Sequence, residues 1–277
     1  MDKTRLSIIT INWNNAEGLR KTVESVTCQQ CSEFEYIIVD GGSTDGSVDV
    51  IRHFDGSSVR LRWVSEKDKG IYNAMNKGIM MANGEYLQFL NSGDTLIDSS
   101  VISNILNEIE CHNNPDIVIG GVLKIQDGKI RRFTQLQDEI GFWRFYNGSL
   151  PHPSSFIRKS LFEKYGMYDE NLRIVSDWKW FMRVVVFEGV TPIFVRLDVA
   201  LFDMGGISET NTALRNNERR KVLEEMVHPN ILADYRRYNA DIRIMRRIRR
   251  HKCAFKLVSC IERVLFKIEK LKNNKRY

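Results

Sequence analysis

The sequence lacks an uninterrupted run of about 18 apolar residues, so no segment is expected to cross a bilayer as a helix. Its first residues carry too short an apolar stretch, with no small-residue cleavage site behind it, to form a secretory signal. With only 5 prolines among 277 residues and charges of both signs, the chain resembles neither a proline-rich nor a disordered protein. We therefore expect a cytosolic globular protein that can touch a membrane only from the cytosolic side.

Cysteine is also scarce, and its 5 residues are an odd number, which excludes a disulfide scaffold. The one close pair, Cys28 and Cys31, has the spacing of a redox motif or of half a zinc site. No second CxxC or HxxxH-like pair supplies the other half of a metal cage. We interpret the pair as ordinary reduced thiols near a helix end.

The basic character of the chain is confined to its C-terminal part. From residue 236 to 277 there are 15 Lys and Arg against 3 Asp and Glu, whereas the remaining 26 Lys and Arg face 32 Asp and Glu. Leu257, Ile261, Val264, Ile268 and Leu271 recur there at helical spacing, with cations between them. This pattern is typical of a helix at an anionic membrane surface. The alternative is a helix that packs onto the body or onto a second subunit.

Nucleic acid is a third class of partner for a basic segment, but no zinc-finger, RNP-like or homeodomain-like pattern supports it. We therefore expect no nucleic-acid partner. The sequence leaves the number of subunits open.

The preceding part alternates short apolar runs with helical stretches. Strands are predicted at 6–11, 36–39, 61–64, 86–90 and 117–119, and helices at 16–26, 47–54, 70–82 and 99–110. Nearly continuous apolar strands joined by helices predict an α/β fold with a mostly parallel central sheet covered on both faces. A ligand of such a sheet binds across the carboxyl ends of the strands.

The polar residues at these strand ends are the first site candidates. The turn at 10–15 has no glycine before Gly18, which excludes a G-x-G-x-x-G dinucleotide site and favours a smaller nucleotide. Asp40 ends an apolar strand, where a carboxylate can accept from a ribose or base N–H, while Asp45 is expected to cap the next helix. Asp94 follows another strand, in a place suited to a hard divalent cation.

Three segments, YIIVDGGSTDGS (36–47), SEKDKGIYNAMNKG (65–78) and GEYLQFLNSGD (84–94), closely resemble inverting family 2 glycosyltransferases in order and spacing. The likeness is to the branch that builds bacterial exopolysaccharide, colanic-acid-type polymers and O-antigens. Residues 150–183 resemble the acceptor-side segment of that family, and 202–208 the segment that follows. The resemblance implies a GT-A (Rossmann-like) catalytic domain at 1–210 and a basic helical extension at 211–277.

The resemblance also implies roles for individual residues. Asp177 takes the place of the catalytic base, beside a platform of aromatic rings suited to sugar faces; its alternative role is an ordinary helix N-cap. The usual DxD metal motif reads Asn91-Ser92-Gly93 here, so its two carboxylates are absent and Asp94, the next residue, is the implied metal ligand. The donor-binding residues are Thr10, Asn12, Asp40, Asp68, Lys69 and Asn91, and acceptor or lid residues are His152, Trp178 and Gly205, the last as a hinge with Gly206.

The implied reaction moves a sugar from a nucleotide-diphosphate donor to a hydroxyl with inversion. The implied donor is a UDP-sugar rather than a GDP-sugar, with Mn²⁺ or Mg²⁺ as cofactor. The implied acceptor is a glycan or a polyprenyl-diphosphate-linked oligosaccharide at the inner face of the cytoplasmic membrane. Two alternatives are a sugar nucleotidyltransferase, whose GxGxR-type loop is absent, and a noncatalytic nucleotide-sugar-binding or scaffold protein.

Overall fold

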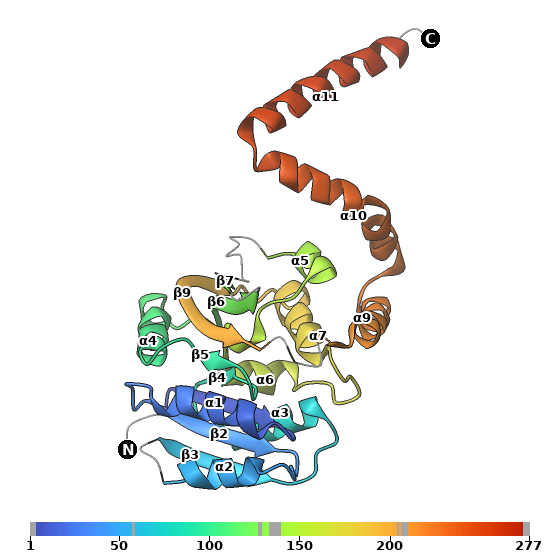
Figure 1. Cartoon of the computed structure of the whole chain (residues 1–277). Coiled ribbons are helices and arrows are strands. Elements are labelled where there is room, and N and C mark those ends of the chain that lie inside the picture. Colours follow the sequence, from blue (N-terminus) through green and yellow to red (C-terminus); the bar gives the residue numbers. More distant parts are fainter. Residues whose placement is uncertain are drawn as a thin grey trace. The chain divides into compact units, whose positions relative to one another are not determined.

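A computed structural model of the chain describes residues 4–56, 59–126, 129–132, 140–203, 205 and 210–273 (Figure 1). The chain divides into two compact units that meet between Glu218 and Arg219, within helix α9 (Thr212–Met226). The predicted division of roles between residues 1–210 and 211–277 stays a prediction.

The first unit is built on one sheet, whose nine described strands follow the order β3-β2-β1-β4-β8-β6-β9-β5, with β7 paired to β6. Strands β3, β2, β1 and β4 are mutually parallel, as are β6 and β9, whereas β8, β7 and β5 run antiparallel to their neighbours. This confirms the predicted mostly parallel sheet. The strands are β1 (Leu6–Asn12), β2 (Phe34–Asp40), β3 (Arg60–Ser65), β4 (Tyr86–Phe89), β5 (Thr95–Leu96), β6 (Ile117–Gln126), β7 (Lys129–Arg132), β8 (Ser155–Arg158) and β9 (Ile193–Phe202).

Helices cover both faces of this sheet, which is why its central strands β1 and β2 are buried along their whole length and are mostly apolar. On one face, Leu6 and Ile8 of β1 share a core with α1, α2 and α4. On the other, Ile9 packs against α3 so closely that a Cβ on Gly78 would lie 2.4 Å from its Cγ2. The helices of this unit are α1 (Ala16–Thr27), α2 (Ser47–Phe54), α3 (Ile71–Met81), α4 (Val101–Cys111), α5 (Phe142–Asn147), α6 (Lys159–Tyr165) and α7 (Ser176–Met182), with a 3-10 turn η1 (His152–Ser154) and a π-helical turn η2 (Arg183–Phe187).

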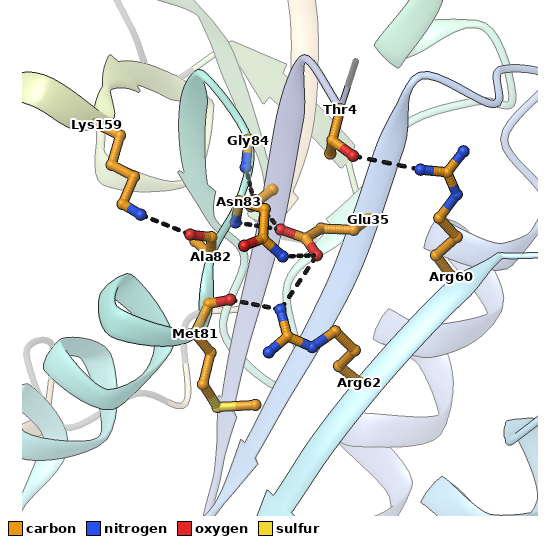
Figure 2. Close-up of polar contacts among 10 residues, drawn as sticks. Thr4, Glu35, Arg60, Arg62, Met81, Ala82, Asn83, Gly84 and Lys159 are labelled. Atoms are coloured by element: carbon orange, nitrogen blue, oxygen red, sulfur yellow. Dashed lines mark hydrogen bonds and ion pairs between the residues drawn. The ribbon is translucent and has the colours of Figure 1, made fainter. Parts of the chain in front are cut away.

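The C-terminal end of α3 is held at the amino edge of the sheet (Figure 2). The Arg62 guanidinium donates to the carbonyl of Met81, and Lys159 Nζ donates to the carbonyl of Ala82 at 2.6 Å. Cations at this end of a helix meet otherwise unpaired carbonyls and the negative end of the helix dipole. The buried Glu35 carboxylate accepts from the N–H of Asn83 and so holds the turn that follows. The opposite end of α3 therefore lies at the carboxyl edge, where a site is predicted.

The second unit consists of the end of α9 with α10 (Pro229–Arg249) and α11 (Lys252–Asn273). Four members of the predicted apolar stripe, Leu257, Ile261, Val264 and Ile268, are solvent-exposed on α11. The side chain of the fifth, Leu271, lies outside the described part of the structure. Among the helices described, none combines the length and apolarity that a membrane crossing requires.

Candidate active site at the carboxyl edge of the sheet

Strands β1, β2 and β4 end side by side at one edge of the sheet. Asn12 and Asp40 are paired at the ends of β1 and β2, and β4 leads through Leu90 into the turn 91–94. Helix α3 follows the end of β3 and begins at this same edge. Parallel α/β sheets bind their ligands here, so the predicted residues can be located one cluster at a time.

Asp40 is fully buried and its carboxylate accepts four hydrogen bonds. Oδ1 accepts from Asn12 Nδ2 at 2.8 Å and Ser43 Oγ at 2.6 Å, and Oδ2 from Ser43 N at 2.9 Å and Ser65 Oγ at 2.6 Å. Burial raises the pKa of Asp40, but these donors outweigh burial and hold the pKa below its ordinary value. The carboxylate therefore organises the loop after β2, and all four of its acceptor positions are used.

Asn12 carries the unsatisfied atom of this cluster. Its amide nitrogen donates to Asp40, whereas its Oδ1 is buried with no hydrogen-bond partner in the described part of the chain. A buried orphan acceptor costs free energy unless a ligand or water supplies a donor. By contrast, the hydroxyl of the buried Thr10 is already hydrogen-bonded inside the core. Its Oγ1 contacts the Tyr36 hydroxyl at 2.9 Å and donates to the Leu90 carbonyl at 2.6 Å.

Asp68 lies beside this cluster. Its Oδ2 would be 3.2 Å from a Cβ on Gly41, and its Oδ1 pairs with Lys77 Nζ at 2.5 Å. Burial raises the pKa of Asp68, although the ion pair with Lys77 opposes the rise. Lys69 is exposed in the next position, with its backbone N–H donated to Asn73 Oδ1 at 3.2 Å. Asp68 thus lies beside the loop after β2, whereas the contact described for Lys69 is to α3.

Trp13 is a residue of this edge that the sequence analysis missed. Its side chain is 71% exposed, and its Cδ1 would lie 3.2 Å from a Cβ on Gly41. A large aromatic ring left in solvent directly after a buried strand has no packing role to explain it. The signal in the sequence is an indole within the otherwise polar turn after that strand.

Asp94 lies in a second cluster, only 3% exposed. Its Oδ1 accepts from the N–H of Asp203 at 2.8 Å, and burial raises the pKa of Asp94 to about 7. Gly93 has φ of +105°, and a Cβ there would lie 2.6 Å from Asp203 Oδ2. Asn91 Oδ1 has no partner among the residues the structure describes. Asp203, directly after β9, is the second residue that sequence reasoning missed, although it lies within the segment 202–208 that shares the family resemblance.

Within the described structure, the second cluster offers a metal ion only the side-chain oxygens of Asp94, Asp203 and Asn91. No group of three or more His, Cys, Asp or Glu side chains suited to a metal occurs among the described residues. The carboxylates of Asp94 and Asp203 and the Asn91 oxygen are hard ligands, and Mg²⁺ commonly retains water and substrate phosphates beside one or two carboxylates. The residues therefore fit a divalent cation only together with a bound diphosphate.

Asp177 belongs to a third cluster, in the first turn of α7. Its Oδ1 accepts a hydrogen bond of 2.7 Å from the hydroxyl of Tyr72, which lies in the first turn of α3. The N-cap of α7 is Val175, and no side chain caps that end. The alternative role of Asp177 as an N-cap is therefore wrong. The residue is partly exposed, and it is bonded to the end of α3 that lies at the carboxyl edge of the sheet.

The aromatic residues around Asp177 are inside the protein. His152 is buried, its ring stacked on Phe89 at 4.9 Å and its Nε2 2.9 Å from the Tyr168 hydroxyl; burial lowers the pKa of His152. Trp178 is 2% exposed and donates its indole N–H to the Phe145 carbonyl.

Trp180 and Phe181 are buried too, so the expectation of an exposed aromatic platform is wrong. Apolar rings on so short a helix are used to anchor it. Gly205 donates its N–H to Asp203 Oδ1 at 2.9 Å. Gly206 lies outside the described residues, so the hinge stays a prediction.

One family model and several known proteins match the sequence of this chain. The model of the family described as glycosyl transferase family 2 matches residues 7–190. A PGL/p-HBAD biosynthesis glycosyltransferase of Mycobacterium bovis is 30% identical over 213 residues, which are 74% of this chain and 79% of that protein. An uncharacterized glycosyltransferase of Mycobacterium tuberculosis is 31% identical over 211 residues, 73% of this chain and 76% of that one. These names support the family and not the exopolysaccharide branch in particular.

Solved structures share the fold at low identity. Residues 1–349 of Staphylococcus aureus TarS in complex with UDP-GlcNAc superpose with a TM-score of 0.65 and 17% identity, over 79% of this chain and 64% of that one. The mannosyltransferase PcManGT of Pyrobaculum calidifontis, in complex with GDP-Man and Mn²⁺, gives 0.58 and 16%, over 78% of this chain and 60% of that one. This chain therefore spans less than two thirds of those longer chains. Its fold is the GT-A type, and it belongs to glycosyl transferase family 2.

Proposed function

We propose that this protein transfers a sugar from a nucleotide-diphosphate donor, preferentially a UDP-sugar, to a hydroxyl of a glycan or lipid-linked oligosaccharide, with inversion. Its proposed place is the biosynthesis of a cell-surface polysaccharide. The observation that carries the proposal is the Asp177 carboxylate, partly exposed and held by Tyr72 where α3 begins at the carboxyl edge. Membership of glycosyl transferase family 2 supports the reaction class.

The donor would occupy the edge formed by the first two clusters. Trp13 offers an exposed ring on which a base can stack, and Asn12 Oδ1 is an acceptor for a base or ribose donor. Asp40 would act mainly by fixing the loop that lines this place, because its own acceptors are occupied. Asp68 lies beside the same loop, and Lys69 follows it with an exposed side chain; both would contact the base or the phosphates. TarS, whose fold this chain shares, binds UDP-GlcNAc.

The cofactor proposed is Mn²⁺ or Mg²⁺, held by Asp94 and Asp203 with the oxygen of Asn91. When bound, it would neutralise charge that builds on the leaving diphosphate. PcManGT is a fold neighbour that binds Mn²⁺.

Asp177 would supply the base. Its free oxygen takes the proton of the acceptor hydroxyl while that oxygen forms a bond to the anomeric carbon. The bond from the anomeric carbon to the diphosphate oxygen breaks on the opposite face, and the nucleoside diphosphate leaves with that electron pair. One displacement of this kind inverts the anomeric configuration, and a single carboxylate suffices for it.

We propose that helix α11 of the second unit brings the protein to the membrane where its acceptor lies. Exposed apolar residues run along α11, with cations such as Arg263 and Lys267 beside them. Such a helix binds anionic lipid headgroups while its apolar stripe enters the interface. We therefore place the protein peripherally at the inner face of the cytoplasmic membrane, where a polyprenyl-diphosphate-linked acceptor would be presented.

The test of the function is incubation of the purified chain with UDP- and GDP-sugars, with and without Mn²⁺, while release of nucleoside diphosphate is measured. Faster release from one UDP-sugar, increased by Mn²⁺ and by a lipid-linked acceptor, is expected. Donor binding without hydrolysis or transfer under any of these conditions would instead favour the noncatalytic, scaffold alternative.

A further inference from the structure

Tyr72 is placed unusually for a tyrosine of a helix that covers a sheet. It is only 4% exposed, yet its hydroxyl reaches across from the first turn of α3 to the carboxylate of Asp177, 105 positions later in the chain. The distance of 2.7 Å is that of a good charge-assisted hydrogen bond. An ionised carboxylate can only accept, so Tyr72 is the donor.

The donor role of Tyr72 does not change over the working pH range. Burial raises the pKa of Tyr72 well above its ordinary value, and the neighbouring charge of Asp177 raises it further. The hydroxyl therefore keeps its proton wherever an enzyme of this kind works. The bond removes one oxygen of Asp177 from the set available to an acceptor and leaves Oδ2.

Several contacts hold the two helices at this separation. Asn76 of α3 donates to the Tyr168 carbonyl at 2.9 Å and accepts from the Tyr168 N–H at 3.1 Å. Asn73 and Asn76 both donate to Glu170, at 2.9 Å and 2.8 Å. The segment that leads into α7 is thereby fastened to α3, whose other end is held by Arg62 and Lys159 (Figure 2).

We propose that Tyr72 is a positioning residue for sugar transfer: its hydroxyl fixes the rotamer of Asp177 so that Oδ2 faces the acceptor hydroxyl. This inference rests on the proposed function of Asp177 as base. Tyr72 itself touches no reacting atom. Its contribution is the orientation of the base, for which small displacements cost large factors in rate.

Other titratable groups also surround Asp177. His152 of η1 and Tyr168 of the preceding loop both interact electrostatically with it, and each is buried. Lys179, further along α7, is paired with Asp169 at 2.9 Å. Among the hydrogen bonds described, the one from Tyr72 reaches the carboxylate directly, so its removal is expected to disturb the orientation of Asp177 more than the removal of a more distant group.

The experiment is the steady-state kinetics of Tyr72→Phe in the full chain, with kcat and the KM for the donor sugar measured separately. Phenylalanine keeps the buried ring and removes only the hydroxyl that orients Asp177. We expect kcat to fall about tenfold or more, while the KM for the donor sugar is unchanged. A wild-type kcat, or a loss that appears in the donor KM instead, would overturn the proposal.

Tyr86→Phe is the matched control, because that hydroxyl is also buried and donates at 2.7 Å to the Pro115 carbonyl, at the amino edge. It should change stability without lowering kcat. If Tyr72→Phe does not fold, 4-aminophenylalanine and 4-methylphenylalanine at position 72 make the same comparison: kcat should stay near the wild-type value with the amino donor and fall with the methyl group. Asp177→Asn separates the two ideas: an active Asp177→Asn refutes the proposed base, whereas an inactive one beside a Tyr72→Phe of wild-type kcat refutes only the role of Tyr72.

Discussion

The backbone N–H of Asp203 donates a hydrogen bond of 2.8 Å to Oδ1 of Asp94, which joins the end of β9 to the turn after β4. The contact brings a second residue with a carboxylate, Asp203, beside Asp94, the one carboxylate of the turn 91–94. Gly93 permits this approach, since any side chain there would meet the Asp203 carboxylate.

Replacement of either carboxylate is expected to weaken metal binding. We expect Asp94→Asn to reduce the affinity for Mn²⁺ in the presence of UDP by more than tenfold, and Asp203→Asn by a few-fold, because a sparse oxygen site loses one of its ligands. Mn²⁺ binding can be followed by electron paramagnetic resonance. Asp98→Asn, which affects an exposed side chain that accepts from Ser100, is the control. Unchanged Mn²⁺ affinity in both site variants would place the metal elsewhere.

A pH-dependent contribution to stability is expected from Asp40. Asp40→Asn should lower the free energy of unfolding at pH 7 by about 2–3 kcal/mol, because a buried carboxylate with several donors is replaced by an amide that cannot accept them all. The pKa of Asp40 is lower in the folded protein than in an unfolded chain. Its stabilisation is therefore complete above the ordinary pKa of about 3.9 and is lost as pH falls through the lower, folded-state pKa.

The measurement is urea unfolding of wild type and Asp40→Asn between pH 7 and the acid limit of folding. The two free energies should converge toward low pH. Asp49→Asn, at a side chain that is 81% exposed, should differ little from wild type throughout. A constant gap between wild type and Asp40→Asn would show that the hydrogen bonds to the charged carboxylate are not its source.

The fit between α3 and β1 can be tested at Gly78. A Cβ there would lie 2.4 Å from Cγ2 of the buried Ile9, so Gly78→Ala is expected to destabilise the fold by about 1–3 kcal/mol in spite of the better helix propensity of alanine. Gly141→Ala adds the same methyl group where nothing lies within 4 Å, and should change stability by less than about 0.5 kcal/mol. Equal thermal shifts for the two variants would contradict the packing described.

The sequence predicted the first half of the sheet well, for a physical reason. Strands such as β1 and β2 are buried on both faces, so their sequences are mostly apolar and end in polar turns. Antiparallel β8 and the two-residue β5 carry no such pattern, and the sequence analysis assigned neither. Their places depend on packing that only the folded chain provides.

In the candidate site, too, the sequence predicts some residues and not others. Asp40 and Asp94 follow buried strands, which a sequence pattern can locate. The partners of Asp94 and Asp177 come from positions more than 100 residues away, and hydrogen bonds over such distances leave no periodic signal. The aromatic ring of Trp178 suggested a contact with the sugar, but the ring is buried in the core.

The second unit is tested with vesicles. We expect that replacing four cations of α11 by glutamine weakens binding of the full chain to phosphatidylserine-containing vesicles by tenfold or more. Each cation near an anionic surface contributes about 1 kcal/mol to the free energy of binding. Binding is measured by co-sedimentation. Phosphatidylcholine vesicles should bind neither form. The four positions are Lys256, Arg263, Lys267 and Lys270, and the matched control changes four exposed cations of the first unit, Arg52, Lys129, Arg131 and Arg196.

Equal losses in the α11 and control variants would indicate an effect of net charge alone. Full sedimentation of the α11 variant would show that this helix is not the anchor.

The central claim is that Asp177 is the base of a sugar transfer, and Asp177→Asn tests it most directly. The variant should bind the nucleotide-sugar donor with wild-type affinity by calorimetry, while its turnover falls by about 10²- to 10⁴-fold, the usual contribution of a general base. Undiminished turnover by folded, donor-binding Asp177→Asn protein would contradict the account.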